Sequence, residues 1–199
     1  MIELFAYGDA GWGDEILQGL AVTVQLALAT LPLGLALGFL AAFASMSELR
    51  LLRFIGLGYT TVMRGLPEIL TLFVVYNGVG VLLNKLRLWW DPAAGSGDFS
   101  PFVAGIIALG MVFGAFAAEV IRGAFSALDE GQAEAGRAVG MRPSQIFWRI
   151  KLPQLWRFAL PGLGNLWINM LKDTALVSVI ALNDLARMER HANRGIRGV

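Results

Sequence analysis

The chain of 199 residues contains no cysteine and a single histidine, and only 16% of its residues are charged. Without cysteine it forms neither disulfides nor thiolate metal sites, and we expect no metal and no cofactor. No His-Glu-x-x-His run occurs and His191 lies in a charged segment, so we predict no catalytic residue. The ATP-binding pattern Gly-x-x-x-x-Gly-Lys-Ser/Thr is also missing. These absences argue against an intramembrane enzyme and against an ATPase.

Hydrophobic residues dominate what is present. They make up 56% of the chain, and the mean hydropathy is +0.62, values typical of a membrane protein. A net charge of +1 gives no reason to expect a nucleic-acid partner. The residues before the first apolar run include acids but no Lys or Arg, so no cleavable signal peptide is expected.

Four segments are apolar and long enough to cross a bilayer, which takes about 20 helical residues. We expect the first to tilt or kink at Pro32, and the second to break where Gly65 and Pro67 disrupt the helix. The sequence therefore predicts an all-α polytopic membrane helical bundle. The four segments are Ile16–Ser47, Leu51–Asn84, Phe102–Ile121 and Phe158–Leu182.

The basic residues predict an orientation. Arg50 and Arg53 lie between the first two spans, and residues 122–157 carry six Lys or Arg, whereas the opposite side carries only Lys85 and Arg87. Since cytoplasmic loops are enriched in Lys and Arg, residues 122–157 are expected in the cytoplasm and the N-terminus outside.

The polar segment between the third and fourth spans has a pattern of its own. We predict a helix from Asp129 to Ala138 that Gly140 breaks, then a second short helix that starts near Pro143 and stops before Pro153. Two short helices at a bend, with an apolar face beside basic residues, suit docking into a groove of a soluble partner. An ordinary amphipathic loop is the alternative.

This spacing resembles the EAA loop of ABC importer permeases, in which Glu-Ala-Ala, a glycine and Ile-x-Leu-Pro occur in fixed register. Gly136 stands where the second alanine usually lies, a mild change worth up to about 1 kcal/mol of helix propensity. The resemblance implies that the loop couples the permease to an ATPase. The matching residues are Glu134, Ala135, Gly140, Ile150, Leu152 and Pro153.

Two more segments are similar to those of polar amino-acid permeases of the histidine, arginine and opine type. They are Arg64-Gly65-Leu66-Pro67-Glu68 and Lys172-Asp173-Thr174. Ionisable groups inside spans usually face a bundle interior or a watery path. We assign Glu68, Lys172, Asp173 and Thr174 to the substrate pathway, and Arg64, Gly65 and Pro67 to structure.

Structural alternatives remain for these charged groups. Arg64 and Glu68 have the i,i+4 spacing of a helical ion pair, and Lys172 can pair with Asp173 across a neighbouring helix. For Glu119, an ion pair with Arg122 at the cytoplasmic boundary is favoured over a gate. The pairs Gly34-x-x-x-Gly38 and Gly110-x-x-x-Gly114 permit close helix approach, which fits packing between subunits.

The resemblance covers residues 16–185 and implies a type I ABC importer permease in a bacterial inner membrane. Its implied partners are ATP-binding cassette subunits, a second permease chain, an external substrate-binding protein and lipid. Small permeases of this family usually have five spans, so we expect the fifth to be missing, with residues 1–15 and the polar tail 186–199 both outside. The alternative function is an ATP-independent channel or secondary transporter, which inverted repeats would favour.

Overall fold

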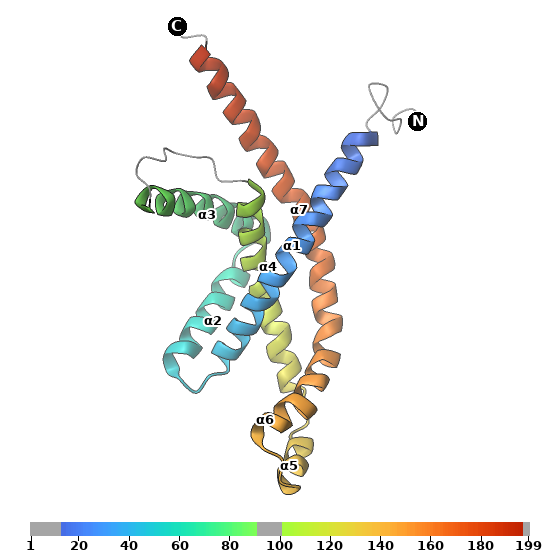
Figure 1. Cartoon of the computed structure of the whole chain (residues 1–199). Helices are drawn as coiled ribbons and strands as arrows, with labels where there is room; N and C mark the ends of the chain where they lie inside the picture. The colour runs from blue at the N-terminus through green and yellow to red at the C-terminus, as the bar shows by residue number, and fades with distance from the viewer. Residues whose placement is uncertain (1–12, 91–100, 197–199) are drawn as a thin grey trace. The chain divides into compact units, whose positions relative to one another are not determined.

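A computed structural model describes residues 13–90 and 101–196, with side chains placed for 17–67, 70–90 and 102–174. Within these ranges every regular element is helical (Figure 1). The elements are α1 (Gly13–Ser45), α2 (Arg50–Gly65), α3 (Glu68–Trp90), α4 (Pro101–Ser126), α5 (Glu130–Ala138), α6 (Pro143–Ile146), a π turn (Phe147–Lys151) and α7 (Leu152–Ile196).

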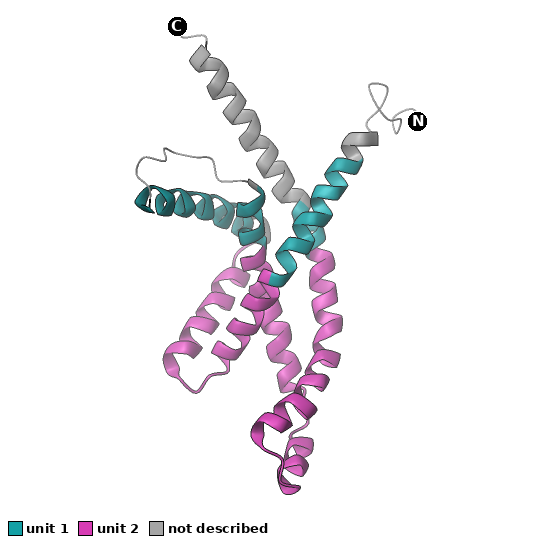
Figure 2. Cartoon of the chain, in the orientation of Figure 1, with its two compact units in different colours: residues 1–32, 69–109, 170–199 teal, residues 33–68, 110–169 magenta. Residues whose placement is uncertain are grey.

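The helices form two compact units, and α1, α4 and α7 each contribute to both (Figure 2). Unit 1 comprises Met1–Pro32, Ile69–Leu109 and Met170–Val199, and unit 2 comprises Leu33–Glu68 and Gly110–Asn169. The polar loop between α4 and α7 lies in unit 2.

Two of the expected spans are found as helices long and apolar enough to cross a membrane. They are Leu17–Ser45 of α1 and Phe102–Ser126 of α4, and the broken pair α2 and α3 adds a third if it is counted as one span. The fourth expected span, residues 158–182, falls within α7, but the side chains beyond residue 174 lie outside the described residues.

The predicted break in the second apolar region is confirmed. Helix α2 ends at Gly65, Leu66 is extended with φ −102° and ψ 151°, and α3 begins at Glu68. The residue before a proline is restricted to extended backbone, which explains why Leu66 is extended and the helix stops at Gly65. Helix α3 then continues to Trp90, beyond the expected end at Asn84, because the intervening residues have no helix breaker.

Within unit 2, α1 and α4 approach closely at four glycines. A Cβ atom added to Gly38 would lie 2.8 Å from the Ala117 Cβ and 3.3 Å from the Gly114 carbonyl oxygen. One added to Gly114 would lie 2.8 Å from the Leu37 Cβ and 3.1 Å from the Gly34 oxygen. The two glycine pairs therefore pack against each other inside this chain, and the expectation that they serve packing between subunits is wrong.

Helix α2 packs on the same part of unit 2. A Cβ on Gly56 would lie 2.6 Å from the Ser45 nitrogen and 2.9 Å from the Ala41 oxygen, so the helix backbones nearly touch. Tyr59 Oη donates a hydrogen bond of 2.5 Å to the Met111 carbonyl of α4. These contacts surround a buried cluster of Ala41, Ala42, Ala118 and Ile121, against which Phe39, Tyr59 and Phe125 pack.

Unit 1 buries mainly aliphatic and small side chains. Two of its buried hydroxyl groups donate to their own helix, Thr30 Oγ1 to the Leu26 oxygen and Thr174 Oγ1 to the Leu171 oxygen, both at 2.7 Å, which lowers the cost of placing a polar atom in an apolar interior. The largest fully buried side chains of unit 1 are Thr30, Thr71, Leu72, Leu109 and Thr174.

Candidate functional site

The first half of the loop is a helix with both ends fixed by local hydrogen bonds. Asp129 Oδ1 accepts the Gly131 N–H at 2.9 Å, so the helix begins at the predicted place. At the other end, the N–H groups of Gly140 and Met141 donate to the Arg137 and Gly136 oxygens, both at 3.0 Å. This is a Schellman motif, and Gly140 has the left-handed φ of +81° that the motif needs. The predicted break at Gly140 is confirmed.

The second half of the loop differs from its prediction. Helix α6 begins at Pro143, where Gln145 Oε1 accepts the Arg142 N–H at 2.9 Å, but it does not stop before Pro153. It passes into the π turn, in which the Leu152 N–H bonds to the Phe147 oxygen, and from there into α7. The prediction failed because the wider π turn that precedes Pro153 accommodates its missing backbone donor, so the helix continues past the proline.

The two halves pack through small residues of α5 and isoleucines of α6 and the π turn. Ala133, Gly136 and Ile146 are buried between them. A Cβ on Gly136 would lie 3.1 Å from Ile150 Cδ1 and 3.2 Å from Ile146 Cγ1, both tighter than usual contacts. The glycine that replaces the usual alanine therefore lowers helix propensity but allows both isoleucines to approach α5.

Polar contacts stabilise α5 and tie it to the π turn and the start of α7. Glu130 lies 3.4 Å from Lys151 Nζ and 3.6 Å from an Arg137 nitrogen. Gln154 Nε2 donates to Gln132 Oε1 at 2.8 Å and to the Ile150 oxygen at 2.9 Å. Exposed ion pairs contribute at most about 1 kcal/mol each, so these contacts orient the two halves while apolar packing holds them together.

The structure brings the motif residues into one small body made of α5, α6, the π turn and the first residues of α7. Glu134, Ala135, Gly140 and Pro153 are exposed, whereas Ile150 and Leu152 are half-buried.

Two exposed apolar side chains of this body were missed by the sequence reasoning. Val139 is 78% exposed and Trp148 is 66% exposed. They could have been identified from the sequence as large apolar residues within a polar, basic loop, because exposed apolar side chains often mark contact surfaces.

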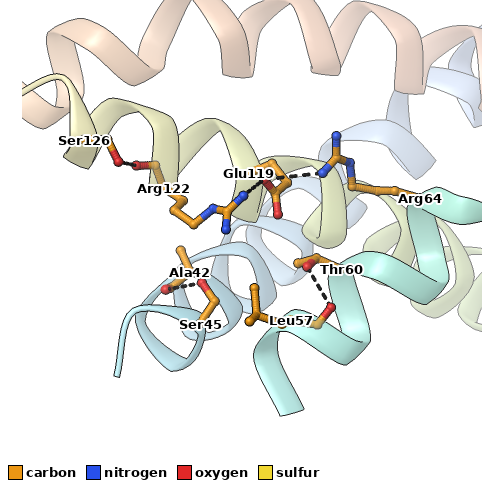
Figure 3. A network of polar contacts seen from close by, with 8 residues as sticks. All are labelled: Ala42, Ser45, Leu57, Thr60, Arg64, Glu119, Arg122 and Ser126. Atoms are coloured by element: carbon orange, nitrogen blue, oxygen red, sulfur yellow. Dashed lines mark hydrogen bonds and ion pairs between the residues drawn. The ribbon is translucent and has the colours of Figure 1, made fainter. Parts of the chain in front are cut away.

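A second polar cluster lies where α2 ends beside α4 (Figure 3). Glu119 accepts a hydrogen bond from Arg122 and lies 3.4 Å from Arg64 Nη1. The predicted pair of Glu119 and Arg122 is confirmed. Arg64 pairs with Glu119 of another helix and also lies 5.7 Å from the centre of the Phe116 ring; the side chain of Glu68, its expected partner, is outside the described residues.

The predicted pathway residues are only partly described. In α7, Lys172 is exposed, Asp173 is half-buried and Thr174 is fully buried, with its hydroxyl donating to the Leu171 oxygen at 2.7 Å. Their assignment to a substrate pathway stays a prediction.

Known proteins resemble this chain over most of its length. The nopaline transport system permease protein NocQ of Agrobacterium fabrum is 42% identical over 186 residues, which cover 94% of this chain and 79% of that protein. The histidine/lysine/arginine/ornithine transport system permease protein HisQ of Escherichia coli is 40% identical over 186 residues, which cover 92% and 80%. A crystal structure of an amino acid ABC transporter with histidines aligns with a TM-score of 0.70 and 31% identity, over 92% of this chain and 79% of that one.

The family described as the binding-protein-dependent transport system inner membrane component matches residues 34–195. This match spans both the loop and the helices on either side of it, and the aligned structure confirms the predicted helical bundle. The chain therefore belongs to that family of inner-membrane proteins, as a permease of the polar amino-acid ABC importers.

Proposed function

We propose that this permease converts closure of a pair of ATP-binding subunits into alternating access for a polar amino acid, with residues 122–157 as the coupling loop. The observation that carries the proposal is the continuity of α6, the π turn and α7. A force on α6 reaches α7 through an uninterrupted helical backbone, and α5 is joined to that helix by the packing of Gly136 against Ile146 and Ile150. A rigid lever of this kind suits a transition between two global states.

The contact surface for the ATPase would be the exposed side of the loop. Val139 and Trp148 offer apolar anchors there, and Glu134 is exposed on the same small body. Central apolar anchors with a polar surround are typical of protein interfaces.

Replacing both Val139 and Trp148 by serine tests the docking surface. We expect the ATPase subunit to be lost when the complex is purified, and ATP-driven uptake to fall in proteoliposomes. The matched control is Phe54→Ser on α2, another exposed aromatic (76%) outside the loop, which should keep the subunit. Retention of the ATPase by the loop variant would refute the proposed surface.

In the proposed orientation the loop lies in the cytoplasm and the N-terminus outside, as the distribution of Lys and Arg favours. A second permease chain completes the pathway, and an external binding protein delivers the substrate. Cysteines introduced singly at Ser144 and Ser47 test the orientation, because the chain has no native thiol. Both should react with a membrane-impermeant reagent only after the membrane is opened.

We propose a basic amino acid or opine as the substrate, with Glu68, Lys172, Asp173 and Thr174 along its path. Carboxylates attract a cationic side chain, and the similar proteins are named for nopaline and for histidine, lysine, arginine and ornithine. Asp173→Asn removes one charge and nearly keeps the shape, so uptake of arginine should fall more than uptake of a neutral amino acid. An equal fall for both would make Asp173 structural.

A further inference from the structure

The coupling loop has two open concavities that differ in charge. One, of about 480 Å³, is lined by Arg137 and Lys151 together with Glu130. The other, of about 570 Å³, is lined by Arg149 and Arg157 and has no acid in its wall. We call the second the Arg149–Arg157 concavity.

The arginines of this concavity are not neutralised. Glu130 forms ion pairs with both basic residues of the first concavity, at 3.4 and 3.6 Å. Neither Arg149 nor Arg157 takes part in an ion pair or a side-chain hydrogen bond within the part of the chain that the structure describes. Two uncompensated guanidinium groups on one open wall favour an anionic ligand.

The rest of the wall is amphipathic and partly fixed. Gln154 is held by its hydrogen bonds to Gln132 and to the Ile150 oxygen, so the amides form an ordered polar floor. Ile150, Pro153 and Phe158 add an apolar side. Such a wall suits a ligand with an anionic head joined to an apolar body.

The position along the chain indicates which ligand this is. Arg157 is directly followed by the apolar run of residues 158–182, whose first side chain, Phe158, is 52% exposed. The concavity thus lies at the boundary between the polar loop and the segment that the sequence predicts to cross the membrane. Basic pockets at such boundaries bind the headgroups of anionic lipids.

We propose that the Arg149–Arg157 concavity binds the phosphate of an anionic phospholipid, with the start of an acyl chain along Phe158. The positive charge of the concavity and its position beside the expected membrane span favour a lipid over a soluble protein. A soluble protein partner would not need the apolar side that Phe158 adds at this boundary. Bound lipid would hold the base of α7 at a constant depth in the membrane.

The test uses the permease purified in detergent with its ATP-binding subunits. Native mass spectrometry measures retention of dioleoyl-phosphatidylglycerol and dioleoyl-phosphatidylcholine, with inorganic phosphate as a separate arm. The variant is Arg149→Gln with Arg157→Gln. The matched control is Arg137→Gln with Lys151→Gln, which removes the same charge from the neighbouring concavity.

We expect phosphatidylglycerol to bind the variant about thirtyfold more weakly, while the control keeps the affinity of the native complex. Equal losses in variant and control would show a general charge effect and overturn the proposal, as would equal binding of the two lipids. Binding of inorganic phosphate as tight as that of the lipid would also overturn it. If the variant lost the ATPase subunit but bound lipid as before, Arg149 and Arg157 would contact protein rather than lipid, and the proposal would be wrong. This outcome does not depend on whether the complex transports amino acids.

Discussion

Glycines shape both the contact between α1 and α4 and the proposed coupling loop, but for different physical reasons. At Gly38 and Gly114 the backbones are so close that a single added carbon would meet another atom at 2.8 Å. At Gly140 an added Cβ would meet no described atom within 4 Å, and what matters is a φ of +81°. The first region needs the absence of a side chain, and the second needs a backbone conformation.

Glycine therefore has two different roles in this protein, close packing of helices in one region and a tight bend in the other. The contact of α1 with α4 is apolar and tightly packed, so a change there should affect folding of unit 2. The loop is small, polar and exposed, and a change at its bend should alter the direction of α6 while the membrane helices stay intact. Stability and coupling should therefore be separable by mutation.

The largest effect is expected for Gly38→Val. The branched side chain would collide with Ala117 and the backbone of Gly114, and overpacking typically costs about 1 to 3 kcal/mol or more. Thermal unfolding of the permease in detergent should shift to clearly lower temperature. Gly58→Val is the control, because a Cβ there would meet no described atom within 4 Å. Similar unfolding temperatures for the two variants would contradict the close contact of α1 and α4.

Gly140→Val should come next, at about 1 to 3 kcal/mol of local strain, because β-branched residues avoid positive φ. We expect ATP-driven uptake to be lost while the protein remains folded in the membrane. Gly140→Asn serves as the control, since asparagine tolerates the left-handed region. The comparison would fail if valine left uptake intact, or if it unfolded the helices as Gly38→Val does.

A smaller effect is expected for Gly136→Ala. Alanine gains up to about 1 kcal/mol of helix propensity but presses on Ile150 and Ile146. Adding Ile150→Val removes the nearer methyl group, so the double variant should be more stable than the sum of the single changes predicts. A double-mutant cycle of unfolding free energies measures this coupling, and strict additivity would show that the contact is not tight.

The smallest effect is expected for Glu130→Gln. Its two ion pairs are exposed, so the loss of unfolding free energy should stay below about 1 kcal/mol and shrink as salt is added. Chemical unfolding at low and high salt checks this. A larger, salt-independent loss would mean that Glu130 holds the two halves of the loop together.

Features that depend on neighbouring residues could be predicted from the sequence. Asp129 caps a helix, Gly140 ends it and Pro67 restricts the residue before it, and each effect acts within a few residues of backbone. The apolar runs likewise predicted the helices α1 and α4, because a helix that crosses a bilayer must be apolar along most of its length. The family resemblance could also be recognised from the sequence, because each motif that carries it is a short segment of the chain.

Other features were decided only by tertiary structure. Arg64 pairs with Glu119 of α4, which is far from it in the chain, and the glycine pairs of α1 and α4 face each other within one chain. Trp148 and Val139 are exposed because nothing in unit 2 covers them among the described residues. Local sequence determined the start of α5 at Asp129, its end at Gly140 and the end of α2 before Pro67, since those effects act through adjacent backbone. Which charges, glycines and apolar side chains meet depends on how the helices pack, because the partners are far apart in the chain.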